Sequence, residues 1–253
     1  MRNHRKPMID ALANAMRAAR TVTVLTGSGL SADSGVPTFR DAQEGLWARY
    51  RAEDLASPEA FERDPDTVWQ WYRARRQQIA AVEPNAGHRA LAELQDQLPD
   101  LRLVTQNVDG LHQRAGHRDV IEFHGNLLSN RCHRERRIVQ VDDATDSPPP
   151  CPHCGGLVRP NVVWFGEAIP EEAIAAATTA ARQSDLFVAV GTSAVVQPAA
   201  GLADLARGHG ARIGEINPEE TTLSASVDFR IRARAADALP ALVQALGAQD
   251  TPQ

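Results

Sequence analysis

The chain has 253 residues, of which 43% are hydrophobic and 23% are charged, and its formal net charge at pH 7 is −5. This composition excludes a largely disordered chain, and the negative balance gives no general attraction to nucleic acid or to an anionic membrane. No apolar run is long enough to span a bilayer, and three cysteines cannot form a fully paired disulfide framework. We therefore expect a cytoplasmic protein with one large domain, or with a smaller domain inserted into it.

Apolar runs alternate with amphipathic stretches along most of the chain. An Arg-rich start leads into the apolar pattern Ile9, Leu12, Ala13 and Met16, which predicts a first helix. Strands are then predicted at 21–25, 101–105, 120–123, 186–190 and 211–216, and helices at 86–97, 171–182, 199–207 and 236–246. This order predicts an α/β fold in which a parallel sheet carries helices on both faces.

The predicted strands end in loops that should lie together. In parallel sheets, ligands bind where the carboxyl ends of the strands open into loops. We therefore expect one shared rim, formed by the loops that begin at Gly27, Gln106, Gly191 and Asn217.

Two segments interrupt the alternation. Residues 41–85 have a helical pattern and are rich in aromatic side chains, whereas residues 126–160 hold all three cysteines. We predict that this helical insertion and this zinc-ribbon-like insertion together form a small domain. The large domain would then consist of residues 1–40, 86–124 and 161–253.

A glycine-rich loop, Gly27-Ser28-Gly29, follows the first predicted strand. Glycines let a backbone turn sharply and approach a pyrophosphate, but a strict dinucleotide fingerprint would also have glycine at the position of Ala32. Alone, the loop is therefore equally compatible with a structural turn. Its continuation is more specific, because Phe39 suits a flat ring and Arg40 suits a phosphate.

Five motifs resemble the signatures of the sirtuins, which are NAD-dependent protein-lysine deacylases. They occur in family order and cover nearly the whole chain, from residue 21 to about residue 240. The motifs are Gly27-Ser28-Gly29-Leu30-Ser31 with Ser34-Gly35-Val36-Pro37-Thr38-Phe39-Arg40, Thr105-Gln106-Asn107-Val108-Asp109-Gly110-Leu111-His112, Phe123-His124-Gly125, Val163-Trp164-Phe165-Gly166-Glu167 and Gly191-Thr192-Ser193. The resemblance implies a Rossmann-like fold with NAD as its cofactor.

The resemblance also implies a reaction at C1′ of the nicotinamide ribose. The carbonyl oxygen of an acyl-lysine attacks as nicotinamide leaves, and a base activates the ribose hydroxyls so that the acyl group moves to the sugar. Histidine suits such a base, and the motif match assigns this role to His124, with Asn107 and Asp109 as further catalytic residues. An Asx-type turn would also explain Asn107 and Asp109, and His112 is expected to have a packing or hydrogen-bonding role.

The residues expected to bind NAD follow from the same motifs. The set is Gly27, Ser28, Gly29, Ser31, Ala32, Pro37, Phe39, Arg40, Trp47, Gln106, Asn107, Val108, Asp109, Gly191, Thr192, Ser193, Asn217, Pro218, Glu219 and Ala235.

The substrate side of the site is expected on two segments. The extended run Val163, Trp164, Phe165 and Gly166 is implied to accept an acyl-lysine peptide as an added strand, although an ordinary buried strand would have the same pattern. Tyr72 and Arg75, three apart on a predicted helix, resemble the Tyr-x-x-Arg pair of the class III branch, which removes succinyl and malonyl groups. Outside this family, such a pair is nearly always a core aromatic residue beside a solvated cation.

The cysteines predict a zinc site with an unusual ligand. Cys151 and Cys154 have the spacing of a zinc knuckle, and Cys132 opens the partner knuckle, in which Glu135 occupies the slot where sirtuins usually have cysteine. Glu135 is the candidate fourth ligand of a structural zinc, although His133 or His153 could complete a tetrahedron. A decayed site that binds no metal is the alternative.

Other functional classes fit the sequence less well. A non-catalytic NAD-binding protein would not need His124, Asn107 and Asp109 together, and an ADP-ribosyltransferase would not need the Tyr72 and Arg75 pair. A zinc-ribbon nucleic-acid binder is disfavoured by the net charge and by the dispersed arginines. The expected partners are acyl-lysine proteins or peptides, without nucleic acid or membrane, and the sequence leaves the oligomeric state open.

Overall fold

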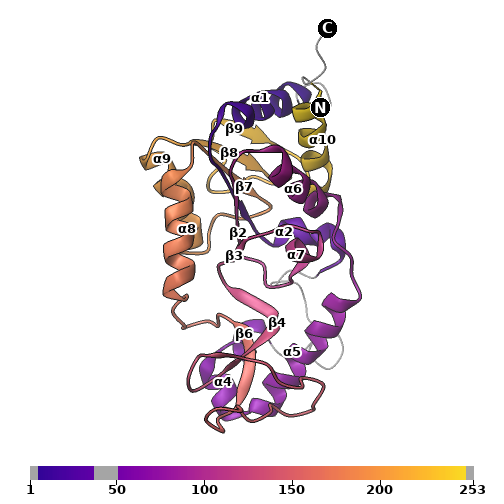
Figure 1. The fold of residues 1–253 in the computed structure, drawn as a ribbon, viewed down its shortest axis with the longest axis vertical. Coiled ribbons are helices and arrows are strands. Elements are labelled where there is room, and N and C mark those ends of the chain that lie inside the picture. The colour runs from indigo at the N-terminus through magenta and orange to yellow at the C-terminus, as the bar shows by residue number, and fades with distance from the viewer. Residues whose placement is uncertain (1–4, 37–50, 249–253) are drawn as a thin grey trace.

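The computed structural model describes residues 5–36 and 51–248, and its larger part is built on a parallel sheet (Figure 1). Six strands pair in the order β3-β2-β1-β7-β8-β9, and every neighbouring pair is parallel. The strands are β1 (Val22–Thr26), β2 (Leu101–Thr105), β3 (Val120–Glu122), β7 (Leu186–Val190), β8 (Arg212–Ile216) and β9 (Phe229–Ile231). The predicted parallel sheet is thereby confirmed.

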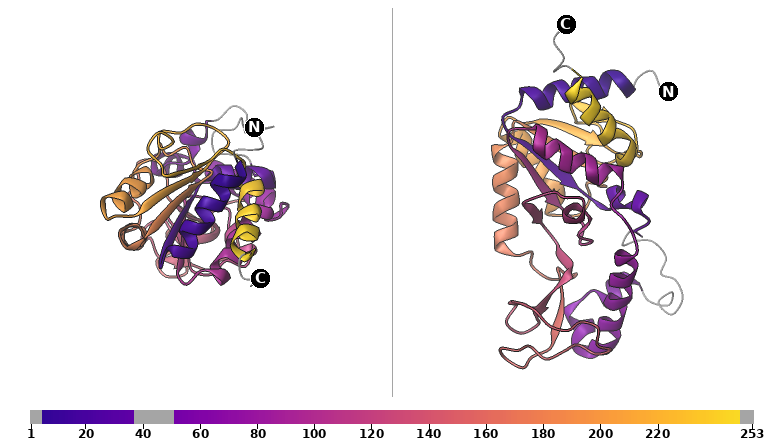
Figure 2. Two further views of the ribbon diagram at one scale, coloured as in Figure 1. Left: turned by 90° about the horizontal axis from the view of Figure 1, so that it is seen from above. Right: turned by 45° about the vertical axis from the view of Figure 1, so that its right-hand side comes forward.

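Helices cover both faces of this sheet, as the turned views show (Figure 2). One core cluster joins the sheet to α1 (Arg5–Ala18), α6 (Ala86–Gln97) and α10 (Ala235–Gly247), and it includes Val24 and Leu103. A second cluster joins the opposite face to α8 (Glu171–Gln183) and α9 (Leu202–Gly208), and it includes Leu25. Successive strand residues point to opposite faces, so a continuously apolar strand such as β1 is buried on both sides.

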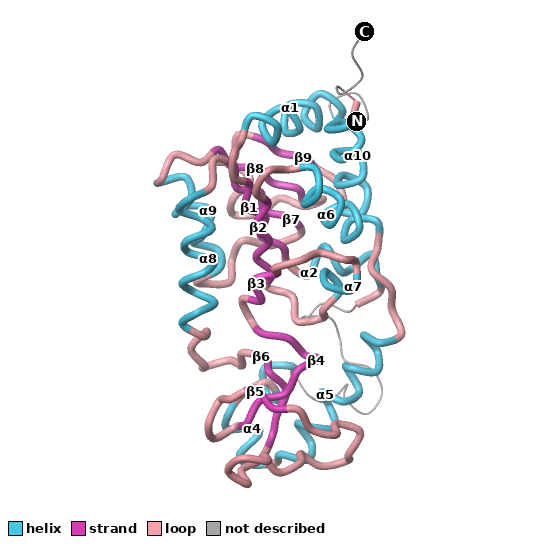
Figure 3. Tube along the Cα trace, viewed as in Figure 1, coloured by secondary structure: helices cyan, strands magenta, loops and turns pink. Residues whose placement is uncertain are grey.

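A smaller module lies beyond the carboxyl edge of the sheet (Figure 3). Its antiparallel sheet has the order β5-β4-β6, with β4 (Gly125–Cys132), β5 (Ile138–Val139) and β6 (Val158–Val162). The helices are α3 (Ala52–Leu55), α4 (Pro58–Arg63) and α5 (Pro65–Ala80). Trp71 and Tyr72 of α5 share a buried cluster with Leu127 of β4 and Trp164.

Local sequence explains where the helices of the module begin. The Ser57 and Asp64 side chains each accept a backbone N–H at the start of the following helix, and a proline stands at the first helical position in both cases. At α6, the Asn85 side chain and His88 form a reciprocal capping box. Because Asp64 caps the start of α5, this helix can begin at Pro65 with only one residue between it and the end of α4 at Arg63.

Short helical segments complete the described chain. They are α2 (Ser28–Ser31), α7 (Leu111–Arg114) and the 3-10 turns η2 (Ala32–Ser34) and η4 (Ala199–Gly201). The sequence did not predict β4, β5, β6 or the edge strand β9. Within residues 5–36 and 51–248, no helix combines the length and apolar character needed to cross a membrane.

Candidate active site

The glycine loop after β1 packs directly against the loop after β7. The Gly29 amide donates to the Gly191 carbonyl at 2.8 Å, and the Gly27 amide donates to the Val190 carbonyl at 3.0 Å. A Cβ atom on either Gly27 or Gly29 would lie 2.8 Å from the Gly191 oxygen, and Gly191 itself has φ of 60°. Only glycine fits this backbone approach, and the predicted shared rim is confirmed for these two loops.

A buried polar cluster joins the glycine loop to the loop after β2. Asn107 Nδ2 donates to the Gly27 carbonyl and to Ser31 Oγ, both at 3.1 Å, and Ser31 Oγ donates to Asp109 at 2.7 Å. The other Asp109 oxygen accepts the Leu111 amide at 3.0 Å, which is the expected Asx-type bond. Burial raises the pKa of Asp109, although the bonds from Leu111 and Ser31 act in the opposite direction.

Thr192 links the remaining two loops of the rim. Gln106 Nε2 donates to Thr192 Oγ1 at 3.0 Å, and Asn217 Nδ2 donates to the Thr192 carbonyl at 2.9 Å. Asn217 in turn accepts the Glu219 amide at 3.1 Å. All four expected loops therefore meet at one rim, which presents amide and hydroxyl groups suited to the ribose and phosphate groups of a dinucleotide.

The other residues expected to bind NAD fall into three groups. Ser28, Ala32, Ser193 and Pro218 are exposed beside the rim, and Val108 is half-buried. Ala235 is only 2% exposed and belongs to the core below the rim, so its side chain has little surface to offer a ligand. Four expected residues lie outside the described part of the chain: Pro37, Phe39, Arg40 and Trp47.

His124 lies at the rim between β3 and β4 and is half-buried. Its Nδ1 is 3.1 Å from the Gln106 carbonyl oxygen, so the tautomer that satisfies this contact carries its proton on Nδ1. Nε2 is then the basic nitrogen. Burial lowers the pKa of His124, and the bond to Gln106 partly offsets this effect. The imidazole is therefore neutral, and able to accept a proton, at neutral pH.

The expected peptide segment connects His124 to the small module. The Val163 amide donates to the His124 carbonyl at 2.9 Å, and the Phe165 amide donates to the Ala56 carbonyl at 3.0 Å. The chain is not extended throughout, because it turns at Phe165 and Gly166, where φ of Gly166 is 81°. Phe165 is 51% exposed, which differs from an ordinary buried strand.

Tyr72 and Arg75 lie on α5, opposite this segment. Tyr72 is buried, and its hydroxyl accepts a hydrogen bond from Trp164 Nε1 at 2.8 Å. Arg75 lines a small cavity with Gly35, Val36 and Ile79, directly after the glycine loop. Burial raises the pKa of Tyr72 and lowers that of Arg75, while the charge of Arg75 acts to lower the pKa of Tyr72. The two side chains are thus electrostatic neighbours, with Arg75 at the cavity and Tyr72 buried within α5's packing against Trp164.

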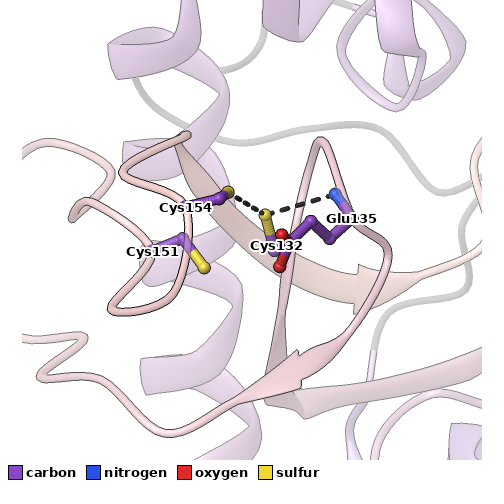
Figure 4. A group of neighbouring side chains, drawn as sticks. All are labelled: Cys132, Glu135, Cys151 and Cys154. Atoms are coloured by element: carbon purple, nitrogen blue, oxygen red, sulfur yellow. Dashed lines mark hydrogen bonds between the residues drawn. The ribbon is translucent and has the colours of Figure 1, made fainter.

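The three cysteines and Glu135 converge between β4 and β6 (Figure 4). One potential ligand atom from each residue lies within 4.8 Å of all the others, and the Sγ atoms of Cys132 and Cys154 are 3.4 Å apart. Zn–S bonds of about 2.3 Å would place tetrahedral sulfur ligands roughly 3.8 Å apart, so the group fits zinc. Neither histidine joins it: His133 packs on Phe61, and His153 is exposed.

Several supporting residues were not expected from the sequence. Thr26 Oγ1 bonds to Thr105 Oγ1 at 2.8 Å and lies 2.9 Å from His112 Nε2, so the expected hydrogen-bonding role of His112 is confirmed. His88 Nε2 is 3.4 Å from Ser31 Oγ, and burial lowers the pKa of His88 to about 4. The Asn85-x-x-His88 spacing before a predicted helix was the available signal for this residue.

The sequence and fold match known proteins over most of the chain. Residues 27–198 match the Sir2 family model. A deacylase of Aquifex aeolicus is 46% identical over 220 residues, covering 86% of this chain and 92% of the relative, and one of Mycolicibacterium paratuberculosis is 48% identical over 233 residues, covering 90% and 98%. Both relatives are named NAD-dependent protein deacylase.

Solved structures give the same result. A Sir2 homolog–NAD complex superposes with a TM-score of 0.88 at 42% identity, covering 94% of this chain and 93% of that one. A Sir2 mutant described with deacetylated p53 peptide and 3′-O-acetyl ADP ribose has a TM-score of 0.81 at 28% identity, covering 93% and 97%. The chain belongs to the Sir2 family. This confirms the sirtuin resemblance, while the class III branch is not specified by these relatives.

The lowered pKa of His124 gives a pH prediction. A base acts only when it is unprotonated, so a pKa below the ordinary 6.5 should place the acidic limb of the kcat/KM profile for peptide deacylation at a midpoint below 6.5. His124→Ala should abolish product formation, whereas the exposed His209→Ala should leave the profile unchanged. A midpoint above 6.5, or sustained turnover by His124→Ala, would contradict the assignment.

Proposed function

We propose that the protein is an NAD-dependent protein-lysine deacylase that removes succinyl and malonyl groups, and also acetyl groups. The acyl group is transferred to ADP-ribose, and nicotinamide is released. The activity of the relatives supports the deacylase class. The observation that carries the acyl preference is the pair Tyr72 and Arg75 on α5. Tyr72 contacts Trp164, in the segment whose Val163 amide donates to the His124 carbonyl.

The rim residues have separate roles in this proposal. When bound, NAD supplies the nicotinamide–ribose bond that breaks and the ribose hydroxyls that receive the acyl group. His124 Nε2 removes a proton from a ribose hydroxyl, while the Gln106 carbonyl holds Nδ1 in the required tautomer. Asn107 and Asp109 stabilise the glycine loop through Ser31. The Asn107 side-chain N–H groups are donated to Gly27 and Ser31, and its Oδ1 would accept from the ribose or nicotinamide side.

The remaining rim residues would bind the rest of NAD. Thr192 and Ser193 would bind phosphate or ribose oxygens, and Asn217 the adenosine ribose. The large domain would be formed by residues 1–40, 86–124 and 161–253, and the small domain by the two insertions. We also place the protein in the reducing cytoplasm, where thiols such as those of Cys132 and Cys151 remain reduced.

The acyl pocket is proposed at the end of α5 nearest the glycine loop. Its phenol and guanidinium are both donors, and a carboxylate at the end of a succinyl or malonyl chain accepts from both. An acetyl group has no oxygen at that position, so it gains nothing from the pair. The preference for acidic acyl groups would therefore come from two donors, the buried Tyr72 hydroxyl and the half-buried Arg75 guanidinium.

We also propose a structural zinc ion held by Cys132, Cys151, Cys154 and Glu135. The geometry of the four ligand atoms supports this set. The site lies in the small-module cluster of Cys132, Val139, Cys151 and Val158, away from the rim, and zinc would stabilise that cluster rather than take part in the reaction. A carboxylate is a harder ligand than a thiolate, so we expect weaker zinc binding than at a four-cysteine site.

Arg75→Met tests the acyl assignment. A hydrogen bond to a charged group contributes about 1.5–3 kcal/mol, so kcat/KM for a succinyl-lysine peptide should fall roughly ten- to hundredfold. Deacetylation should fall far less. The matched control is Arg73→Met on the same helix, because Arg73 pairs with Asp146 away from the cavity. An equal loss for succinyl and acetyl peptides in Arg75→Met would refute the carboxylate role.

Elemental analysis tests the zinc site. Purified protein should contain about one zinc per chain, Glu135→Ala should lose it to a chelator faster, and Glu135→Cys should retain it longer. Glu62→Gln is the control, since Glu62 is a nearby carboxylate that lies 3.5 Å from His133 and is not one of the four converging ligand residues. Zinc well below one per chain, or equal retention in all variants, would favour a decayed site.

A further inference from the structure

The Trp164 indole holds the hydroxyl group of Tyr72 in one orientation. Trp164 Nε1 lies 2.8 Å from the phenol oxygen, and both residues are 2% exposed. An indole N–H only donates, so the phenol oxygen must be the acceptor. The phenol proton therefore points away from Trp164, and within residues 5–36 and 51–248 it is donated to no other group.

Trp164 is itself fixed by a buried charged cluster. Its backbone amide donates to Glu167 Oε2 at 2.9 Å, and Arg131 donates to the same carboxylate at 2.8 Å. Arg159 also pairs with Glu167, and its guanidinium lies 3.6 Å from the centroid of the Trp164 ring. The side chains of these three charged residues are at most 8% exposed. The ring and the backbone of Trp164 are therefore both held in place.

We infer that Trp164 is a positioning residue for acyl selection: its N–H occupies the acceptor side of Tyr72, and the Tyr72 proton is thereby left for the carboxylate of the substrate, beside Arg75. This inference rests on the proposed carboxylate role of Tyr72 and Arg75. It assigns to Trp164 a function that acts through Tyr72, distinct from any contact with the peptide backbone.

Two features make the orientation matter. Burial raises the pKa of Tyr72, so the phenol remains protonated and is a donor throughout the working pH range. A hydroxyl group that rotated freely would spend part of its time pointing its lone pairs at the incoming carboxylate, which is repulsive. The fixed acceptor bond removes that orientation without adding a competing acceptor to the pocket.

The test compares Trp164→Phe, Tyr72→Phe and the double variant. Phenylalanine keeps an aromatic ring under Arg159 but lacks the N–H. We expect the succinyl-to-acetyl ratio of kcat/KM to fall roughly three- to tenfold in Trp164→Phe, mainly through KM for the succinyl peptide. In the Tyr72→Phe background, which has no hydroxyl group to orient, Trp164→Phe should leave the ratio unchanged.

A purely structural role predicts a different pattern. Succinyl and acetyl activities would then fall by the same factor in Trp164→Phe, or the ratio would fall again in the double variant, and either result overturns the inference. If Trp164→Phe does not fold, the isosteric tryptophan analogue with sulfur in place of the indole nitrogen, placed at position 164, must give the same drop in the ratio.

Arg75→Met separates this inference from the proposed function. If Arg75→Met lowers the ratio and the Trp164 variants do not, only the positioning role fails. If Arg75→Met also leaves the ratio unchanged, the carboxylate site itself is wrong, and the role of Trp164 fails with it.

Discussion

The site depends on one backbone contact, the approach of the glycine loop to the loop after β7. The Gly29 amide reaches the Gly191 carbonyl at 2.8 Å, and a Cβ on Gly27 or Gly29 would collide with that oxygen. This contact brings the ends of β1 and β7 together without side chains between them. Polar groups of the neighbouring loops can therefore hydrogen-bond across the junction. Thr192, the residue after Gly191, then joins Gln106 and Asn217 to the same rim.

A second connection makes the acyl pocket part of that rim. The His124 carbonyl accepts the Val163 amide, and the next residue, Trp164, donates to Tyr72 on α5. The proposed base and the proposed acyl-binding helix are therefore separated by one short segment. This segment is anchored by Glu167 and two buried arginines, so a rigid turn, rather than a regular strand, sets the distance between the base and the pocket.

Much of this arrangement follows from the sequence, because the central strands are short β-rich, mainly apolar runs that end at a glycine or a polar residue. β2 and β7 were predicted with their observed bounds, and the four rim loops were predicted to meet. The edge strand β9 was missed because Arg230 separates Phe229 from Ile231, so this strand has no continuous apolar run such as Val120-Ile121 in β3. The Trp164–Tyr72 bond was missed because it joins residues 92 apart, and no local spacing reports such a contact.

The cysteine cluster, unlike the Trp164–Tyr72 bond, could be predicted from the sequence. The positions of Cys132, Glu135, Cys151 and Cys154 were aligned by their spacing together with the sirtuin resemblance, which left His133 and His153 as alternative ligands. The fold brings the three cysteines and Glu135 together and leaves both histidines outside.

The most direct test of the whole account is to incubate the unmodified protein with NAD and succinyl-, malonyl- or acetyl-lysine peptides and to identify the products by mass. The account predicts free lysine peptide, nicotinamide and O-acyl-ADP-ribose in equal amounts, with acidic acyl groups turned over most efficiently. Nicotinamide release with ADP-ribose attached to the peptide, or with the acyl group still on lysine, would contradict it.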